Sequence, residues 1–235
     1  MRIEKQNGGV MNNQKICFIM CVNNWQFANE AIYYINRLNI PEGYEIDMIT
    51  IEEADCMTEG YQAAMEQSDA KYKIYMHQDV MITNLDFLQD CLDILQADES
   101  IGMLGLVGST SLPEDGVAWN NQKRCGMLYG NNVVTANITT FPVPITDRYQ
   151  EVEMVDGLLM MTSKDIPWRT DLFKGWDFYD VSQCMEMRRA GYKVVVPRQE
   201  RAWAVHDDGF LNMKDYKKWQ KIFLEEYRGE SGTFA

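Results

Sequence analysis

Strand-length apolar runs alternate with segments of helical periodicity through the first half of this sequence. Residues 16–22 form a continuous apolar run, and residues 25–38 then carry apolar side chains at helical spacing. Residues 44–51 and 57–68 repeat this order, and an apolar run that ends at Met76 begins a third repeat. The alternation predicts an α/β fold with a doubly wound, mostly parallel sheet flanked by helices.

One domain accounts for most of the chain, because 235 residues suffice for a single α/β core. Residues 1–14 are polar and rich in Gly and Asn, so we expect a flexible N-terminus, a single domain over residues 15–228 and a flexible tail over residues 229–235. Residues 108–150 are rich in Ser, Pro, Gly and Asn, with short β-prone pieces. We expect them to form a β-rich excursion over a cleft, since they are too polar for a core of their own.

The C-terminal part of the domain returns to strand and helix patterns. Residues 152–162 have strand character, and the interruption at Asp156-Gly157 predicts a bend where the backbone approaches a ligand. Residues 180–190 have helical spacing and are followed by Gly191, a typical C-terminal cap. The remaining elements are two strands and an amphipathic helix, over residues 193–197, 202–209 and 214–227.

The charge of the chain restricts its partners. A formal net charge of −13 argues against nucleic acid, because nucleic-acid binders need a basic face. An acidic chain can still bind an anionic nucleotide when a divalent cation or a helix N-terminus offsets the charge.

No apolar run approaches the roughly 20 residues of a membrane helix, so we expect no transmembrane segment. The six cysteines form no Cys-x-x-Cys pair, which predicts reduced thiols in a cytoplasmic protein.

The triplet His77-Gln78-Asp79 interrupts an apolar run that resumes at Val80. Ligands of open α/β sheets gather outside the carboxyl ends of the strands, so the triplet suits a binding site. A strand-to-loop turn in which Asp79 caps the next segment is the alternative interpretation. His206 follows a later apolar run, and Asp79 together with His206 could complete a Mg²⁺ or Mn²⁺ site that holds a diphosphate.

Several short motifs share their order and spacing with a known family of enzymes. The motifs are residues 16–24, Gly60-Tyr61-Gln62, residues 75–80, Asp156-Gly157, Phe178-Tyr179-Asp180, residues 189–194 and residues 205–209. Together they resemble the family-2-like glycosyltransferases with the GT-A fold, and within these a bacterial subgroup linked in name to a streptomycin biosynthesis protein. The resemblance spans residues 15–210 and depends on the whole set of motifs, because no single one is specific.

The resemblance implies a nucleotide-diphospho-sugar donor, a saccharide or other hydroxyl acceptor, and Mn²⁺ or Mg²⁺ as the cofactor. Asp79 and His206 match the metal site, and His77 stands where the family has the first Asp of its metal motif. Gln62 replaces the Asn that is expected after Gly-Tyr. The implied donor-binding residues are Asn23, Asn24, Gln62, His77, Gln78, Asp79, Asp156 and Gly157.

Asp180 matches the catalytic base of the inverting members of that family. Inversion requires a base that deprotonates the acceptor hydroxyl while a cation stabilises the leaving diphosphate. We expect the aromatic neighbours Trp176, Phe178 and Tyr179 to raise the pKa of Asp180 modestly. Ser182 departs from the family, which often has a second acidic residue at that position.

We therefore predict an inverting, metal-assisted glycosyltransferase, and two other classes remain open on sequence. His77 and Ser182 suggest a non-catalytic module on the same fold that binds nucleotide-sugars or glycans. A nucleotidyltransferase ranks last, because Asn23-Asn24-Trp25 follows the first strand where that class has a Gly-rich phosphate loop and a basic residue.

Overall fold

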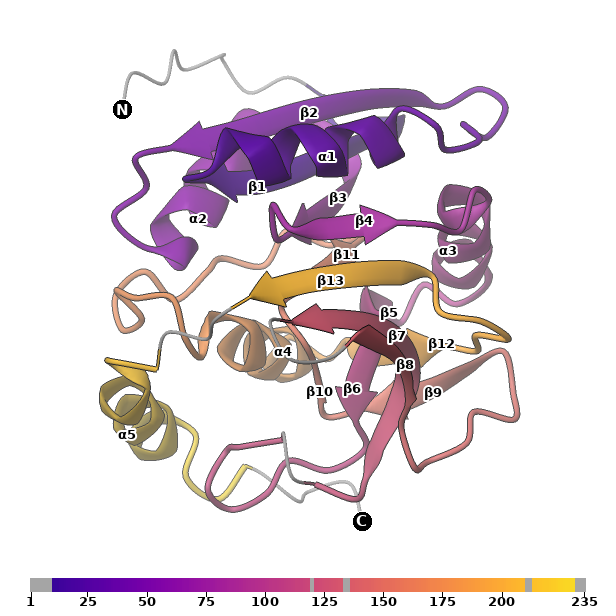
Figure 1. Cartoon of the computed structure of the whole chain (residues 1–235). Helices are drawn as coiled ribbons and strands as arrows, with labels where there is room; N and C mark the ends of the chain where they lie inside the picture. The colour runs from indigo at the N-terminus through magenta and orange to yellow at the C-terminus, as the bar shows by residue number, and fades with distance from the viewer. Residues whose placement is uncertain (1–9, 119–120, 133–135, 210–212, 231–235) are drawn as a thin grey trace.

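The computed structural model describes residues 10–118, 121–132, 136–209 and 213–230. Within these residues five helices flank two β-sheets (Figure 1). None of the helices in the described part is long and apolar enough to cross a membrane. The helices are α1 (Trp25–Ile35), α2 (Met57–Gln67), α3 (Phe87–Ala97), α4 (Tyr179–Arg189) and α5 (Tyr216–Glu226).

The larger sheet contains seven strands, five of which point in the same direction. β1 is parallel to β2 and β3, and β5 is parallel to β12, whereas β11 and β9 are antiparallel to their neighbours. The predicted α/β architecture is thus confirmed, with two antiparallel strands that the sequence pattern did not orient. The strand order is β2 (Glu45–Glu52), β1 (Asn12–Val22), β3 (Ala70–Met76), β11 (Leu159–Thr162), β5 (Ile101–Gly105), β12 (Lys193–Pro197) and β9 (Tyr149–Val152).

The apolar run of β1 explains why both faces of this sheet are covered. Ile16, Phe18 and Met20 pack in one core with α1 and α3, while Cys17 and Ile19 pack in a second core with α2, α4 and α5. Successive side chains of a strand point to opposite faces, so a continuous apolar run requires helices on both sides.

β1 begins earlier than the predicted domain start at Lys15. Asn12 pairs with Ala70 of β3, and its side chain donates a hydrogen bond to Glu45 at the start of β2. Polar residues can extend this strand because their backbone groups continue the ladder. Residues 1–9 and 231–235, which include most of the two segments predicted to be flexible, lie outside the described residues.

The segment predicted to be a β-rich excursion supplies three of the six strands of the second sheet. Residues 101–107 are a continuous apolar run, which predicts a single strand. In the structure this run divides at Leu106, so that β5 belongs to the first sheet and β6 to the second. β13 lies between β4 and β7 (Figure 1). The strands are β10 (Met154–Val155), β6 (Val107–Ser109), β7 (Arg124–Asn132), β13 (Ala204–Gly209) and β4 (Val80–Ile82), with β8 (Ala136–Thr140) paired to β7.

Candidate active site

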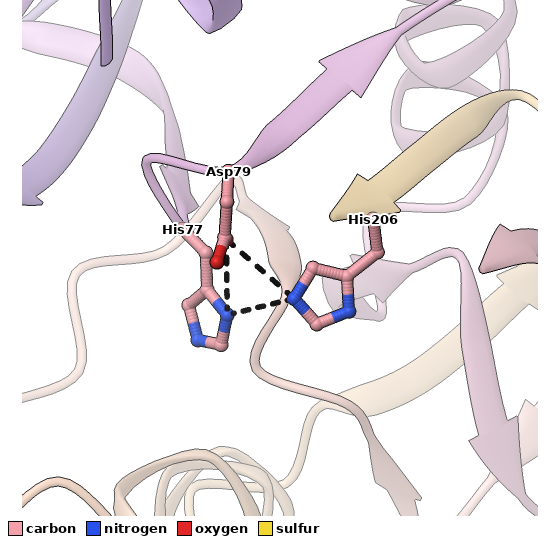
Figure 2. A group of neighbouring side chains, drawn as sticks. All are labelled: His77, Asp79 and His206. Atoms are coloured by element: carbon pink, nitrogen blue, oxygen red, sulfur yellow. Dashed lines mark hydrogen bonds and ion pairs between the residues drawn. The ribbon is translucent and has the colours of Figure 1, made fainter. Parts of the chain in front are cut away.

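Two imidazoles and one carboxylate converge where β3, β4 and β13 meet (Figure 2). His77 and Asp79 come from the connection between β3 and β4, and His206 comes from β13. The His206 Nε2 atom lies 3.5 Å from Asp79 Oδ1 and 3.5 Å from His77 Nδ1, and the last two atoms are 4.0 Å apart. The three side chains thus offer ligand atoms within 4.8 Å of one another.

Backbone hydrogen bonds hold the segments that carry this cluster. The N–H of His77 donates to the carbonyl of Leu158 over 3.0 Å, and the N–H of Asp207 donates to the carbonyl of Asp79 over 2.9 Å. His206 lies in the antiparallel ladder between β13 and β4. The turn considered for Asp79 from the sequence is present, and it brings the carboxylate to the two imidazoles.

The electrostatics of the cluster suit a divalent cation. The Asp79 Oδ1 atom is buried without a hydrogen-bond partner. Burial opposes its charge, but the imidazoles of His206 and His77 outweigh this effect and hold the pKa of Asp79 below its ordinary value. Burial and the charge of His206 lower the pKa of His77, which favours the neutral imidazole that metals bind. A buried carboxylate oxygen without a hydrogen-bond partner, beside an imidazole whose pKa is lowered, fits a metal ligand set.

Tyr179 fixes the orientation of the His77 ring. Its hydroxyl is hydrogen-bonded to His77 Nε2, while His77 Nδ1 faces Asp79 and His206. When Nε2–H donates to the hydroxyl, the lone pair lies on Nδ1, as metal-binding histidines require. The sequence pattern indicated Tyr179 only as part of the motif around Asp180 and as its aromatic neighbour, because sequence alone does not reveal a contact between residues 102 positions apart.

Asp180 lies in the first turn of α4, directly after Tyr179, with its carboxylate toward the connection between β10 and β11. Its Oδ2 atom accepts a hydrogen bond of 3.0 Å from the N–H of Gly157. Burial, followed by the charge of Asp156, raises the pKa of Asp180 to about 7. The expected direction of the shift is therefore correct, and the carboxylate of Asp156 adds to it. A carboxyl group with this pKa can exchange protons efficiently near neutral pH.

Gly157 allows the start of α4 to approach this connection. A Cβ atom at position 157 would overlap the Tyr179 hydroxyl and stand 2.9 Å from Asp180 Cβ. The residue before α4, Phe178, has a φ of +61°, a left-handed conformation that is strained for a non-glycine residue. The group that lies close to Gly157 is thus the start of α4, and the predicted approach of a ligand to this backbone stays a prediction.

A cavity of about 440 Å³ brings these groups together. His77 and His206 line it beside Asp156 and Asp180. Arg124 of β7 also lines the cavity, with its guanidinium 4.4 Å from the centre of the Phe141 ring. Arg124 carries no signal in the sequence, since it lies in the irregular part of the chain and in no recognised motif.

Asn23, Asn24 and Gln78 form a hydrogen-bonded group outside the set of residues that line this cavity. The Gln78 Oε1 atom accepts from the N–H groups of Asn23 and Asn24 over 3.1 and 2.9 Å, and Gln78 Nε2 donates to Asn23 Oδ1 over 2.6 Å. The Asn24 side chain also caps α1 by accepting from the N–H of Gln26. These contacts join the end of β1 to the end of β3, and the donor-binding role of the three residues stays a prediction.

Gln62 does not reach the cavity. Its side chain, on α2, accepts a hydrogen bond of 2.8 Å from the N–H of Trp168 and donates one of 2.7 Å to Glu66. Both ends of this amide thus have hydrogen-bond partners within the fold. The donor-binding role of Gln62 stays a prediction. Ser182, the other departure from the family pattern, is buried and donates to the carbonyl of Tyr179.

Solved structures of glycosyltransferases have the same fold. A mannosyltransferase, PcManGT from Pyrobaculum calidifontis, in complex with GDP-Man and Mn²⁺, is 12% identical, with a TM-score of 0.57 over 95% of this chain and 68% of that chain. S. aureus TarS 1-349 in complex with UDP-GlcNAc is 10% identical, with a TM-score of 0.56 over 92% of this chain and 67% of that chain. In a further structure of S. aureus TarS, with 11% identity and a TM-score of 0.54, the match covers 91% of this chain and 40% of that chain. The fold is accordingly the GT-A type, as expected from the sequence.

The family of the chain follows from its sequence. Residues 17–227 match the glycosyltransferase like family, so the chain belongs to that family. None of the curated proteins matches the sequence. Family and fold together support sugar transfer as the class of activity.

Proposed function

We propose that this chain transfers a sugar from a nucleotide-diphospho-sugar to an acceptor hydroxyl with inversion at the anomeric carbon. The observation that carries the proposal is the position of Asp180 and the His77–Asp79–His206 cluster beside one cavity. A cation site and a base at the same cavity can act on the leaving group and on the acceptor separately.

The ligand set of the cluster favours Mn²⁺ over Mg²⁺. Mg²⁺ prefers oxygen ligands, whereas imidazole nitrogen suits transition metals, and two of the three residues here are histidines. A divalent cation at His77, Asp79 and His206 would supply positive charge that stabilises the leaving diphosphate. The use of His77 extends the sequence prediction, which assigned the metal to Asp79 and His206 alone.

Asp180 is proposed as the base. Its carboxylate takes the proton of the acceptor hydroxyl as the hydroxyl oxygen forms a bond to the anomeric carbon. The bond from that carbon to the diphosphate oxygen breaks, and its electron pair leaves with the nucleoside diphosphate. The charge of Asp156 contributes to the raised pKa of Asp180. A pKa near neutral pH lets the base accept and release a proton at that pH.

The donor nucleotide is proposed to lie at the ends of β1 and β3. Asn23, Asn24 and Gln78 are bonded to one another there, which gives a preorganised edge with amide groups. Asp156 and Gly157 are proposed to lie beside the transferred sugar.

The test is a transfer assay with UDP-, GDP-, CDP- and dTDP-sugars, with and without Mn²⁺, followed by NMR assignment of the product anomer. We expect one nucleotide class to support transfer in the presence of Mn²⁺, with inverted configuration. Asp180→Asn should retain donor binding and lose transfer by about 10²–10⁴-fold. Donor binding without any transfer would contradict the proposal and support the non-catalytic binding module.

A further inference from the structure

The cavity beside Asp180 has a largely apolar wall. Val107, Leu128 and Met154 line it from three different strands, β6, β7 and β10. Phe141 and Phe178 add aromatic rings to the same wall. The wall thus combines three strands of the second sheet with the residue before α4, which makes it a property of the fold and not of one loop.

The apolar surface continues to the opening of the cavity. Trp176 and Met213 both line the cavity, and each is 49% exposed. Large apolar side chains that remain exposed beside a cavity commonly mark a surface for an apolar ligand.

Eight of the residues that line the cavity have polar side chains, and all eight side chains are ionisable. They are His77, Arg124, Asp156, Asp177, Tyr179, Asp180, His206 and Tyr216. Among the described residues that line it there is no Ser, Thr, Asn or Gln. A sugar ring carries a hydroxyl on most of its carbons, and each hydroxyl loses binding free energy when it is buried without a partner. The wall formed by Val107, Leu128 and Met154 has no side chain that could pair with such hydroxyls.

We propose that the acceptor is an alcohol with an apolar body, aromatic or aliphatic, whose hydroxyl faces Asp180 and whose body lies against Leu128, Met154 and Phe141. The inference rests on the proposed transfer function and specifies its acceptor class. A volume of about 440 Å³ is large enough to enclose such a body, since pockets for drug-sized ligands begin at about 300 Å³.

Binding of three probes to the full chain tests the acceptor class directly. The probes are 2-naphthylmethanol, 1-octanol and methyl β-glucopyranoside, measured by saturation-transfer NMR titration without any donor. We expect at least one of the two apolar alcohols to bind about tenfold or more tightly than the glucoside, and the better of the two identifies a ring or a chain as the body. A glucoside that binds as tightly as both alcohols would overturn the inference.

Polar substitutions locate the bound alcohol. Leu128→Gln should weaken binding of the better alcohol at least fivefold, and Met213→Gln, at an exposed position that tolerates a polar side chain, should weaken it in the same direction. Ile138→Gln is the matched control, because Ile138 is an exposed apolar residue of β8 that does not line the cavity. Equal affinities in all three variants would overturn the inference, and Met213→Gln keeps the test valid if Leu128→Gln fails to fold.

A transfer assay with the same probes separates this inference from the proposed function. Transfer to the glucoside but to neither alcohol would overturn the acceptor class and leave the transferase function supported. An alcohol could bind in the cavity, as shown by weaker binding to Leu128→Gln or Met213→Gln, without transfer from any nucleotide-sugar to any probe. This result would overturn the transferase function and the acceptor role with it. Transfer to the alcohol, reduced by Leu128→Gln or Met213→Gln and not by Ile138→Gln, supports both.

Discussion

The hydroxyl of Tyr179, at the start of α4, is hydrogen-bonded to His77 Nε2, at the end of β3. This bond connects the two halves of the candidate site, because Asp180 follows Tyr179 directly and His77 belongs to the cluster with Asp79 and His206. The same tyrosine therefore orients a histidine of the proposed metal site, and the next residue, Asp180, is the proposed base.

Tyr179→Phe should weaken Mn²⁺ binding by about 10–100-fold, the usual effect of removing a partner that orients a metal-binding histidine. The affinity can be measured by titration of Mn²⁺ with electron paramagnetic resonance, which needs no substrate. Tyr33→Phe is the control, since Tyr33 lies on α1 with 57% of its surface exposed. Unchanged affinity in Tyr179→Phe would show that His77 does not depend on this bond.

Removal of the Asp79 carboxylate should abolish the increase in Tm that Mn²⁺ produces together with a nucleoside diphosphate. Mn²⁺ with the correct nucleoside diphosphate should raise the Tm of the wild type, because a ligand at 100 times its Kd stabilises the folded state by about 2.7 kcal/mol. Asp79→Asn should lose this increase, and the exposed Asp55→Asn should keep it. The panel is UDP, GDP, CDP and dTDP with and without Mn²⁺, and the absence of any shift in the wild type would contradict the metal site.

Much of the fold could be predicted from the sequence because it depends on apolar periodicity. β12 has the predicted bounds of residues 193–197, and α4 lies within one residue of its prediction at both ends. Strand direction has no such signature, so the antiparallel orientation of β11 was not predicted. The division of the run 101–107 at Leu106 also has no signature in the sequence, because the residues on both sides of Leu106 are apolar and buried.

The candidate site was predictable only in part, because sequence order does not specify which way a side chain points. Asp79 and His206 were selected as strand-end residues, and the structure brings them within 3.5 Å. His77 had no assigned role at the metal, and only the fold reveals that its Nδ1 atom faces the other two residues. Arg124 had no motif to indicate it, although it lines the same cavity.

The pKa of Asp180 predicts a pH-dependent loss of stability. Its folded-state pKa of about 7 lies above the ordinary value of 3.8, so protonated Asp180 contributes stability that is complete below pH 3.8 and is lost as pH rises through about 7. Asp180→Asn cannot ionise, and it should therefore be more stable than the wild type at pH 8 by up to about 4 kcal/mol. Urea unfolding from pH 4 to pH 8 measures the difference.

The exposed Asp55→Asn variant is the control for this unfolding series. It should follow the pH dependence of the wild type, because its carboxylate remains in solvent in the folded state. A difference between Asp180→Asn and the wild type that does not grow from pH 4 to pH 8 would contradict a raised pKa of Asp180 in the folded state.

Asp156→Asn should shift the pH profile of transfer toward lower pH. Burial is the first cause of the raised pKa of Asp180, and the charge of Asp156 is the second, so removal of that charge should lower the pKa only in part. The rate of transfer should then rise at a lower pH than in the wild type, by about one unit or less. A profile with the same midpoint would mean that the two carboxylates do not interact.

Gly157→Ala tests whether the close approach of α4 is required for the site. The added methyl group would overlap the Tyr179 hydroxyl and crowd Asp180 Cβ, and such overpacking commonly costs about 1–3 kcal/mol. We expect a lower Tm and, because both residues must move, weaker Mn²⁺ binding and slower transfer. Gly130→Ala is the matched control, since a Cβ atom there meets nothing within 4 Å. If Gly157→Ala loses stability while Mn²⁺ binding and transfer stay at wild-type levels, the helix start is a packing feature and does not position His77 and Asp180.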